Sequence, residues 1–159
     1  MWHYFRYYQY SPVDHGRAFP GAGSSAMRPI LRVMLRSAES EEERLAMVDS
    51  GADYCLFPLY LTTGLGLLMK DSTPVSGIVG FGLDGSEDVP FWSLALDIGS
   101  GASVVTRVGF TEKLNEYEIG VLGQLGSFSE VEQVTFNYQK GSFGIYTIDP
   151  VAQGAETLK

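Results

Sequence analysis

One carboxylate lies in a short motif that could perform acid–base chemistry. The triplet Asp49-Ser50-Gly51 follows an apolar run at residues 45–48 and precedes Ala52. A strand that ends abruptly at a polar loop can deliver that loop into a cleft, where a carboxylate can take a proton from water or return one. The triplet alone is weak evidence. It occurs by chance in roughly one chain in fifteen of this length, and Asp, Ser and Gly also form ordinary turns.

The elements that would position this loop read mostly as strands. Alternation at residues 28–36 places Leu31, Val33 and Leu35 on one face of a strand. Other expected strands are at residues 54–57, 89–98, 103–110, 117–122, 131–138 and 143–148. Pro58 is placed to begin a short helix over residues 58–65. The acidic residues 37–44 are either a short helix, opened by a Ser40 and Glu43 capping box, or a solvated loop.

Two further segments have distinctive compositions. Residues 1–10 are aromatic and strand-like, too apolar to remain uncovered, and residues 11–25 have the composition of a loop. Residues 75–85 are rich in glycine between apolar side chains, which predicts a mobile hairpin. We therefore expect an extension over residues 1–27, one mostly-β domain over residues 28–150 and a tail over residues 151–159.

Three motifs, taken in order, resemble the retropepsin-like aspartic proteases. The first is the apolar run leading into Asp49-Ser50-Gly51-Ala52, with a second apolar strand after it. The second resembles the glycine-rich flap of that family and consists of Gly77, Ile78, Val79, Gly80, Phe81 and Gly82. The third, Val121-Leu122-Gly123, resembles the element that packs behind the catalytic loop, and residues 124–128 resemble the short helical segment that follows.

The resemblance implies a closed-barrel-like β fold with a flap hairpin and one or two short helices, and an endopeptidase active as a homodimer. Two carboxylates close together share one proton and can act as acid and base. Asp49 is the single aspartate followed by Ser-Gly, so a second copy must supply the other. Ser50 would hydrogen-bond across the two-fold axis, Gly51 would permit close approach, and the hairpin would cover an extended peptide. The alternative is a catalytically silent peptide-binding protein of the same fold.

Composition argues against other function classes. The net charge of −8 and the scattered eleven basic residues disfavour nucleic-acid binding, and no apolar stretch is long enough for a membrane helix. An acidic inhibitor of a basic toxin is a remoter alternative, supported by charge alone. A single cysteine and no signal-like start predict a cytoplasmic protein.

Neither a metal nor a cofactor is expected. His3 and His15 lack partners at ligand spacing and are interpreted as surface residues, whereas Cys55 is interpreted as core. The string from Gly80 to Gly85 matches a dinucleotide-binding pattern but opens no helix that could meet a pyrophosphate.

Overall fold

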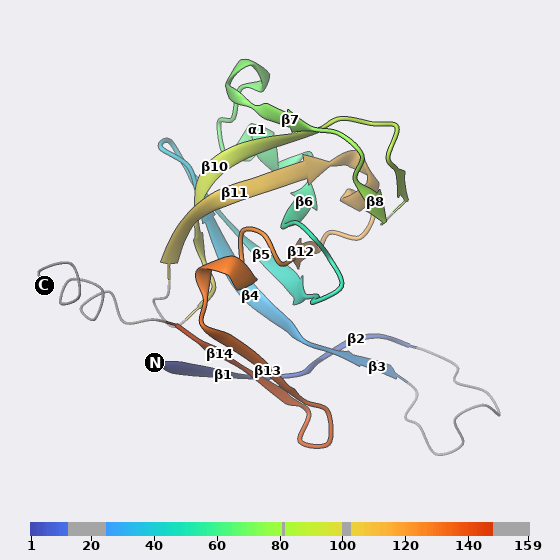
Figure 1. Ribbon diagram of the computed structural model, residues 1–159, viewed down its shortest axis with the longest axis vertical. Helices are drawn as coiled ribbons and strands as arrows, with labels where there is room; N and C mark the ends of the chain where they lie inside the picture. The colour runs from blue at the N-terminus through green and yellow to red at the C-terminus, as the bar shows by residue number, and fades with distance from the viewer. Residues whose placement is uncertain (13–24, 81, 100–102, 148–159) are drawn as a thin grey trace, which may run out of the picture.

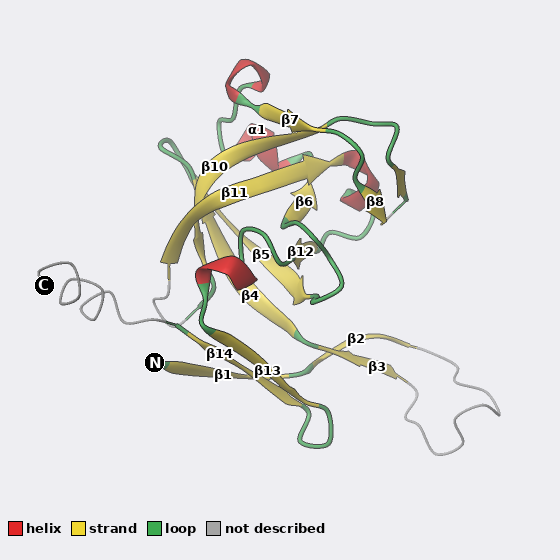
Figure 2. Ribbon diagram, viewed as in Figure 1, coloured by secondary structure: helices red, strands yellow, loops and turns green. Residues whose placement is uncertain are grey.

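The computed structural model describes residues 1–12, 25–80, 82–99 and 103–147, and most of them lie in strands (Figure 2). The strands are β1 (Trp2–Arg6), β2 (Tyr8–Pro12), β3 (Ser25–Arg28), β4 (Ile30–Arg36), β5 (Glu41–Val48), β6 (Leu56–Pro58), β7 (Thr73–Val75), β8 (Val79–Gly80), β9 (Leu83–Asp84), β10 (Val89–Asp97), β11 (Ser103–Thr111), β12 (Gly120–Leu122), β13 (Gln133–Asn137) and β14 (Ser142–Tyr146). The helical elements are α1 (Leu61–Gly64) and the 3-10 turns η1 (Met69–Asp71), η2 (Glu112–Leu114) and η3 (Phe128–Glu130). The mostly-β prediction is confirmed.

The largest sheet closes into a barrel (Figure 1). Its strand order is β11-β6-β12-β5-β4-β10-β7, and an additional pairing between β10 and β11 joins the ends of a six-stranded ring. Closure removes the open edges that would otherwise pair with other chains. The short strand β7 remains outside the ring, paired with β10. The closed-barrel-like fold that the family resemblance implied is confirmed.

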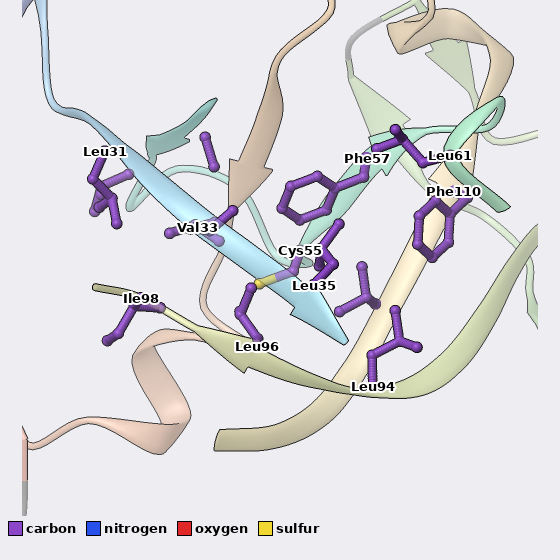
Figure 3. Packing of buried hydrophobic residues seen from close by; sticks show 14 of the residues in the cluster. Leu31, Val33, Leu35, Cys55, Phe57, Leu61, Leu94, Leu96, Ile98 and Phe110 are labelled. Atoms are coloured by element: carbon purple, nitrogen blue, oxygen red, sulfur yellow. The ribbon is translucent and has the colours of Figure 1, made fainter. Parts of the chain in front are cut away.

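The β4–β5 hairpin shows the expected alternation. Leu31, Val33 and Leu35 are all buried, as the period of two in the sequence predicted. Their face packs into the main core, where Phe57, Phe110 and Trp92 also lie, with the Trp92 and Phe110 rings edge to face at 5.6 Å between centroids. Figure 3 shows these leucines and phenylalanines converging from different strands. Each fully buried large apolar side chain contributes about 1.5–3 kcal/mol.

The acidic segment at residues 37–44 is not a helix, and the solvated loop that joins two strands is limited to residues 37–40. Strand β5 already begins at Glu41, opposite Arg36. The Arg36 Nε lies 3.0 Å from the Glu41 carboxylate, and Arg32 pairs with Glu43 at 2.7 Å. Opposite charges across a strand pair contribute roughly 0.2–1 kcal/mol for each pair. A capping-box pattern considers only residues three positions apart, so it does not predict partners on a neighbouring strand.

Several other strand and helix boundaries differ from those expected from the sequence. Helix α1 begins at Leu61 rather than Pro58, because Pro58 ends strand β6 in parallel pairing with Thr111 of β11. The strand expected at residues 117–122 shortens to β12, and Glu118 just before it has a left-handed φ of 53°, which interrupts extended structure.

The aromatic start of the chain joins the body as a strand. β1 pairs antiparallel with β14, and β14 pairs with β13, so both ends of the described chain share one sheet. Phe5 stacks on Phe143 at 5.1 Å between ring centroids, inside the main core. His3 is therefore buried, and its Nε2 lies 3.0 Å from the Thr147 hydroxyl, which corrects the expectation of a surface histidine.

Strands β2 and β3 pair only with each other and extend away from the barrel (Figure 1). His15, the middle of the predicted 11–25 loop and the tail at residues 151–159 lie outside the described residues. Within the described part of the chain, no helix is long and apolar enough to cross a membrane.

The barrel depends on a glycine at the start of β12. A Cβ atom at Gly120 would lie within 2.8 Å of three ring carbons of the fully buried Phe57. We expect Gly120→Ala to lower the free energy of unfolding by about 1–3 kcal/mol, because the packed ring has no room to move. Urea unfolding followed by circular dichroism measures this change.

Gly64→Ala is the matched control, since a new methyl group at the end of α1 meets only the flexible Glu42 side chain. This variant should unfold at the same urea concentration as the wild type or slightly higher. An equal decrease in the free energy of unfolding of the two variants would contradict the role assigned to Gly120.

Candidate active site

The Asp49 loop is a tight turn between two barrel strands. It begins where β5 ends at Val48 and leads into β6. The Asp49 carboxylate Oδ1 accepts a hydrogen bond from the Gly51 N–H at 2.9 Å, and the Ala52 N–H donates to the Asp49 carbonyl at 3.2 Å. These bonds fix the direction of the carboxylate within its own turn. Asp49 is half-buried, and Ser50 and Gly51 are exposed.

Strand β12 lies between the two strands that the Asp49 loop connects. It runs parallel to β5, with Leu122 opposite Val48, and antiparallel to β6, with Val121 opposite Leu56. The Asp49 N–H donates to the Leu122 carbonyl at 3.0 Å. The loop therefore starts from a strand that is hydrogen-bonded to the buried β12.

The chain leaving β12 continues to bind the same loop. The Gln124 N–H donates to the Ala52 carbonyl at 2.9 Å, and the Leu125 N–H donates to the Asp53 carbonyl at 2.8 Å. Together with the bond to Leu122, these contacts hold both arms of the turn. The predicted pairing of the Asp49 motif with residues 121–123 is thus a direct backbone contact in the structure.

Gly123 is required by the closeness of these segments. A Cβ at this position would lie within 2.7 Å of three backbone atoms of Tyr54. Because the Tyr54 backbone cannot move aside as a flexible side chain could, every larger residue would push the Asp49 loop off β12. This close approach explains why the third motif ends in glycine.

One supporting residue was missed by the sequence reading. The Gln124 Nε2 donates to the Ser50 carbonyl at 2.9 Å, which ties the exposed tip of the loop to the chain beyond β12. We expected Gln124 only as the start of a short helical segment at residues 124–128. That helix, η3, begins later, at Phe128. A polar amide directly after the third motif was the available signal.

The glycine-rich segment forms the expected hairpin. Val79 pairs with Asp84 and Gly80 with Leu83, while Phe81 lies outside the described residues. Gly77, Gly80 and Gly82 all have positive φ, at 79°, 114° and 79°. Such angles strongly favour glycine, so the conformation accounts for the composition.

The hairpin packs on the segment that follows Asp49. Ile78 and Leu83 are buried in a second apolar cluster with Leu56 and Leu114, and Tyr54 packs against its edge. Val79 points outward and is 76% exposed. In this arrangement Ile78 anchors the hairpin, so contact between Ile78 and a substrate would require the hairpin to lift.

Hydrogen bonds steady the base of the hairpin. The Ser76 hydroxyl donates to the Asp88 carboxylate at 2.5 Å, and the Ser86 N–H donates to the Asp84 Oδ1 at 2.9 Å. The bonds from Ser86 lower the pKa of the exposed Asp84 carboxyl below its ordinary value. Both bonds lie outside the short β8–β9 pairing of Val79–Gly80 with Leu83–Asp84 or at its end.

Comparison of the structure with solved structures decides the fold. A crystal structure of a retropepsin-like aspartic protease from Rickettsia conorii matches 76% of this chain and 84% of its own, with a TM-score of 0.50 and 14% identity. The chain has a retropepsin-like fold. A foamy viral protease–reverse transcriptase structure matches 59% of this chain and 14% of its own, with a TM-score of 0.36 and 14% identity. No protein-family model matches the sequence, and no curated protein does.

The retropepsin-like fold brings two of the three sequence motifs into contact. The Asp49 turn rests on β12 and on the residues after it, while the hairpin approaches the same region through Tyr54. A cleft of about 660 Å³ opens elsewhere, between the base of the hairpin and η2, with Glu87, Lys113 and Tyr117 in its lining. Asp49 does not line that cleft. The Ser50 and Gly51 tip of the loop is exposed in the single chain.

Possible metal ligands and the cysteine were located in the described residues. These residues contain no group of three His, Cys, Asp or Glu side chains placed to hold a metal ion. Cys55 is fully buried behind the Asp49 loop, and burial raises the pKa of its thiol to about 12. Its interpretation as a core residue is confirmed.

We expect Cys55 to resist thiol reagents in the folded protein. At about pH 8 the native thiol is almost wholly protonated and covered, whereas an unfolded cysteine with a pKa near 8.5 is partly thiolate. Titration with Ellman's reagent should show no rapidly reacting thiol in buffer and one reacting thiol per chain in guanidinium. Rapid reaction of the native protein would contradict the burial of Cys55.

Proposed function

We propose that this chain is an aspartic endopeptidase that acts as a homodimer, with Asp49 of each subunit at the two-fold axis. The observation that carries the proposal is the Asp49-Ser50-Gly51 turn, held on β12 within a retropepsin-like barrel. The proposed substrate is an extended segment of polypeptide. No cofactor is needed, because paired carboxylates supply both the acid and the base.

The chemistry requires a second carboxylate. One aspartate must accept a proton from the attacking water while another donates a proton to the peptide carbonyl oxygen. Two carboxyl groups roughly 3 Å apart cannot both ionise, so the pair holds one proton and fills both roles. Asp49 is the only aspartate in the chain that precedes Ser-Gly, so an isologous dimer is the simplest source of the pair.

The exposure of the loop fits such a dimer. Ser50 and Gly51 are open to solvent in one chain, although backbone bonds to β12 hold the turn rigidly. A rigid, uncovered turn can meet its symmetry copy without reorganising. In this proposal Ser50 bonds across the axis and Gly51 lets the two turns approach.

The hairpin β8–β9 would act as the flap. Its glycines allow it to bend, and its outward Val79 is available for contact. Closing over a bound peptide would exclude water and offer backbone N–H groups to the extended chain. Gly77, Ile78, Gly80, Phe81 and Gly82 share this proposed role.

Replacement of the proposed catalytic aspartate tests the function. Asp49→Asn removes the titrating carboxyl while keeping its size, so we expect peptide cleavage to fall by on the order of 10²–10⁴-fold or more. Mass spectrometry of a diverse peptide mixture between about pH 3 and 8 measures the loss. The wild type should be most active on the acid side of that range, where the pair holds one proton.

Asp71→Asn is the matched control, because this exposed aspartate lies in η1 and lacks the following Ser-Gly. It should cleave like the wild type. Cleavage that survives Asp49→Asn would overturn the proposal. If the wild type and Asp49→Asn both bind peptides but neither cleaves them, the silent peptide-binding alternative is favoured.

Dependence on concentration tests the dimer. Below the dimer dissociation constant, a tenfold dilution should lower the activity per subunit about tenfold, because the dimer fraction falls in proportion. An excess of Asp49→Asn should also suppress the wild type by forming mixed dimers with one carboxylate. An excess of Asp71→Asn should not suppress it. Activity per subunit that is independent of concentration, without suppression, would contradict a shared site.

A further inference from the structure

Within the described part of the chain, the strands β2 and β3 form a ribbon that pairs with no other strand. Tyr8 pairs with Arg28 and Gln9 with Met27, and a bulge follows at Tyr10. Neither strand joins the barrel or the β1-β14-β13 sheet, and Figure 1 shows the ribbon extending away from both. Isolated two-stranded ribbons are marginally stable in water at best. The ribbon therefore needs a surface on which to pack.

The ribbon exposes apolar side chains on both of its faces, because Tyr8 is paired with Arg28 and the next pair, Gln9 with Met27, points to the other side. Tyr8 is 46% exposed, and Tyr10 and Met27 are each 39% exposed. Ala26, by contrast, is buried. Grouped exposed apolar side chains on a projecting segment indicate a contact surface rather than a solvated turn.

The charge distribution indicates what covers this surface. Residues 1–28 contain three arginines and one aspartate, whereas residues 29–159 contain eight basic and eighteen acidic residues. A segment of net charge +2 is thus attached to a remainder of net charge −10. Arg28 at the end of β3 and Arg6 at the end of β1, two residues before β2, are both exposed. Such complementarity draws the ribbon of one copy toward the body of another.

The base of the ribbon lies at the Asp49 loop. β3 runs into β4 through Pro29, whose carbonyl accepts a hydrogen bond from the Val48 N–H at 2.8 Å. Val48 is the residue before Asp49. A second copy that brings its own Asp49 to this edge must therefore approach beside the ribbon.

We propose that the β2–β3 ribbon is a dimerisation arm, which packs Tyr8, Tyr10 and Met27 against the acidic body of a second copy of this chain. Two-fold symmetry makes the contact reciprocal, so each dimer contains two arms. This inference rests on the proposed function, because it assigns the surface by which the two Asp49 loops are brought together.

Sedimentation equilibrium on the full chain tests the arm. The triple variant Tyr8→Ser, Tyr10→Ser and Met27→Ser removes apolar contacts from both arms of a dimer, so we expect its dissociation constant to rise at least about tenfold. The wild type should also dissociate more readily when salt rises from roughly 0.05 M to 0.5 M, because salt screens the arginine contacts.

The matched control is Tyr60→Ser, Met69→Ser and Val105→Ser, which removes three exposed apolar side chains outside the ribbon. Its dissociation constant should equal that of the wild type. If the wild type and the arm variant have the same dimer dissociation constant, the proposed role of the ribbon is wrong, but the proposed function stands. A wild type that remains monomeric while showing Asp49-dependent cleavage would overturn both the arm and the shared site.

Hydrogen exchange of the unmodified chain gives a second measurement that needs no variant. Ribbon amides should exchange at least about tenfold more slowly above the dissociation constant than below it, because partner contact suppresses local opening. Amides of β10 within the barrel serve as the internal reference and should not change. Equal ribbon protection in the monomer and the dimer would overturn the arm.

Discussion

The close approach of β12 to the Asp49 loop is the constraint on which the rest of the structure depends. β12 lies between β5 and β6, so the two strands that carry the loop are not direct neighbours. Gly120 admits the buried Phe57 ring, and Gly123 admits the Tyr54 backbone. Each larger side chain would separate the loop from its support. The barrel closes around this arrangement, and its packed core resists the small displacements that would misdirect a carboxylate.

The Asp49 turn and the β8–β9 hairpin are held in place by different kinds of contact. The Asp49 turn is bound by backbone hydrogen bonds on both arms and by the Gln124 side chain at its tip. The hairpin is anchored through Ile78 and Leu83, and its glycines have positive φ. In the proposed mechanism this hairpin would cover a fixed carboxylate, because orientation lowers the barrier to hydrolysis while closure excludes water.

The start of the chain has two roles that its composition does not separate. β1 is a structural strand that pairs with β14 and contributes Phe5 to the core. β2, only one residue further along, leaves the body altogether. In β1, Phe5 packs against the main core while Tyr4 is exposed, whereas Tyr8 and Tyr10 of β2 are both exposed. Composition predicted that residues 1–10 need covering, but the partner of each strand depends on pairing across the whole chain.

The sequence by itself determined the features that depend on local pattern. The barrel strands followed from alternation, the hairpin from its glycines, and the core position of Cys55 from its apolar neighbours. Contact between the Asp49 motif and residues 121–123 was expected only through resemblance. Tertiary structure alone decided that Glu41 begins a strand opposite Arg36, that His3 is buried beside Thr147, and that Gln124 holds Ser50. In each of these cases the deciding partner is brought near by folding, whereas propensity and periodicity register only neighbours within a few positions.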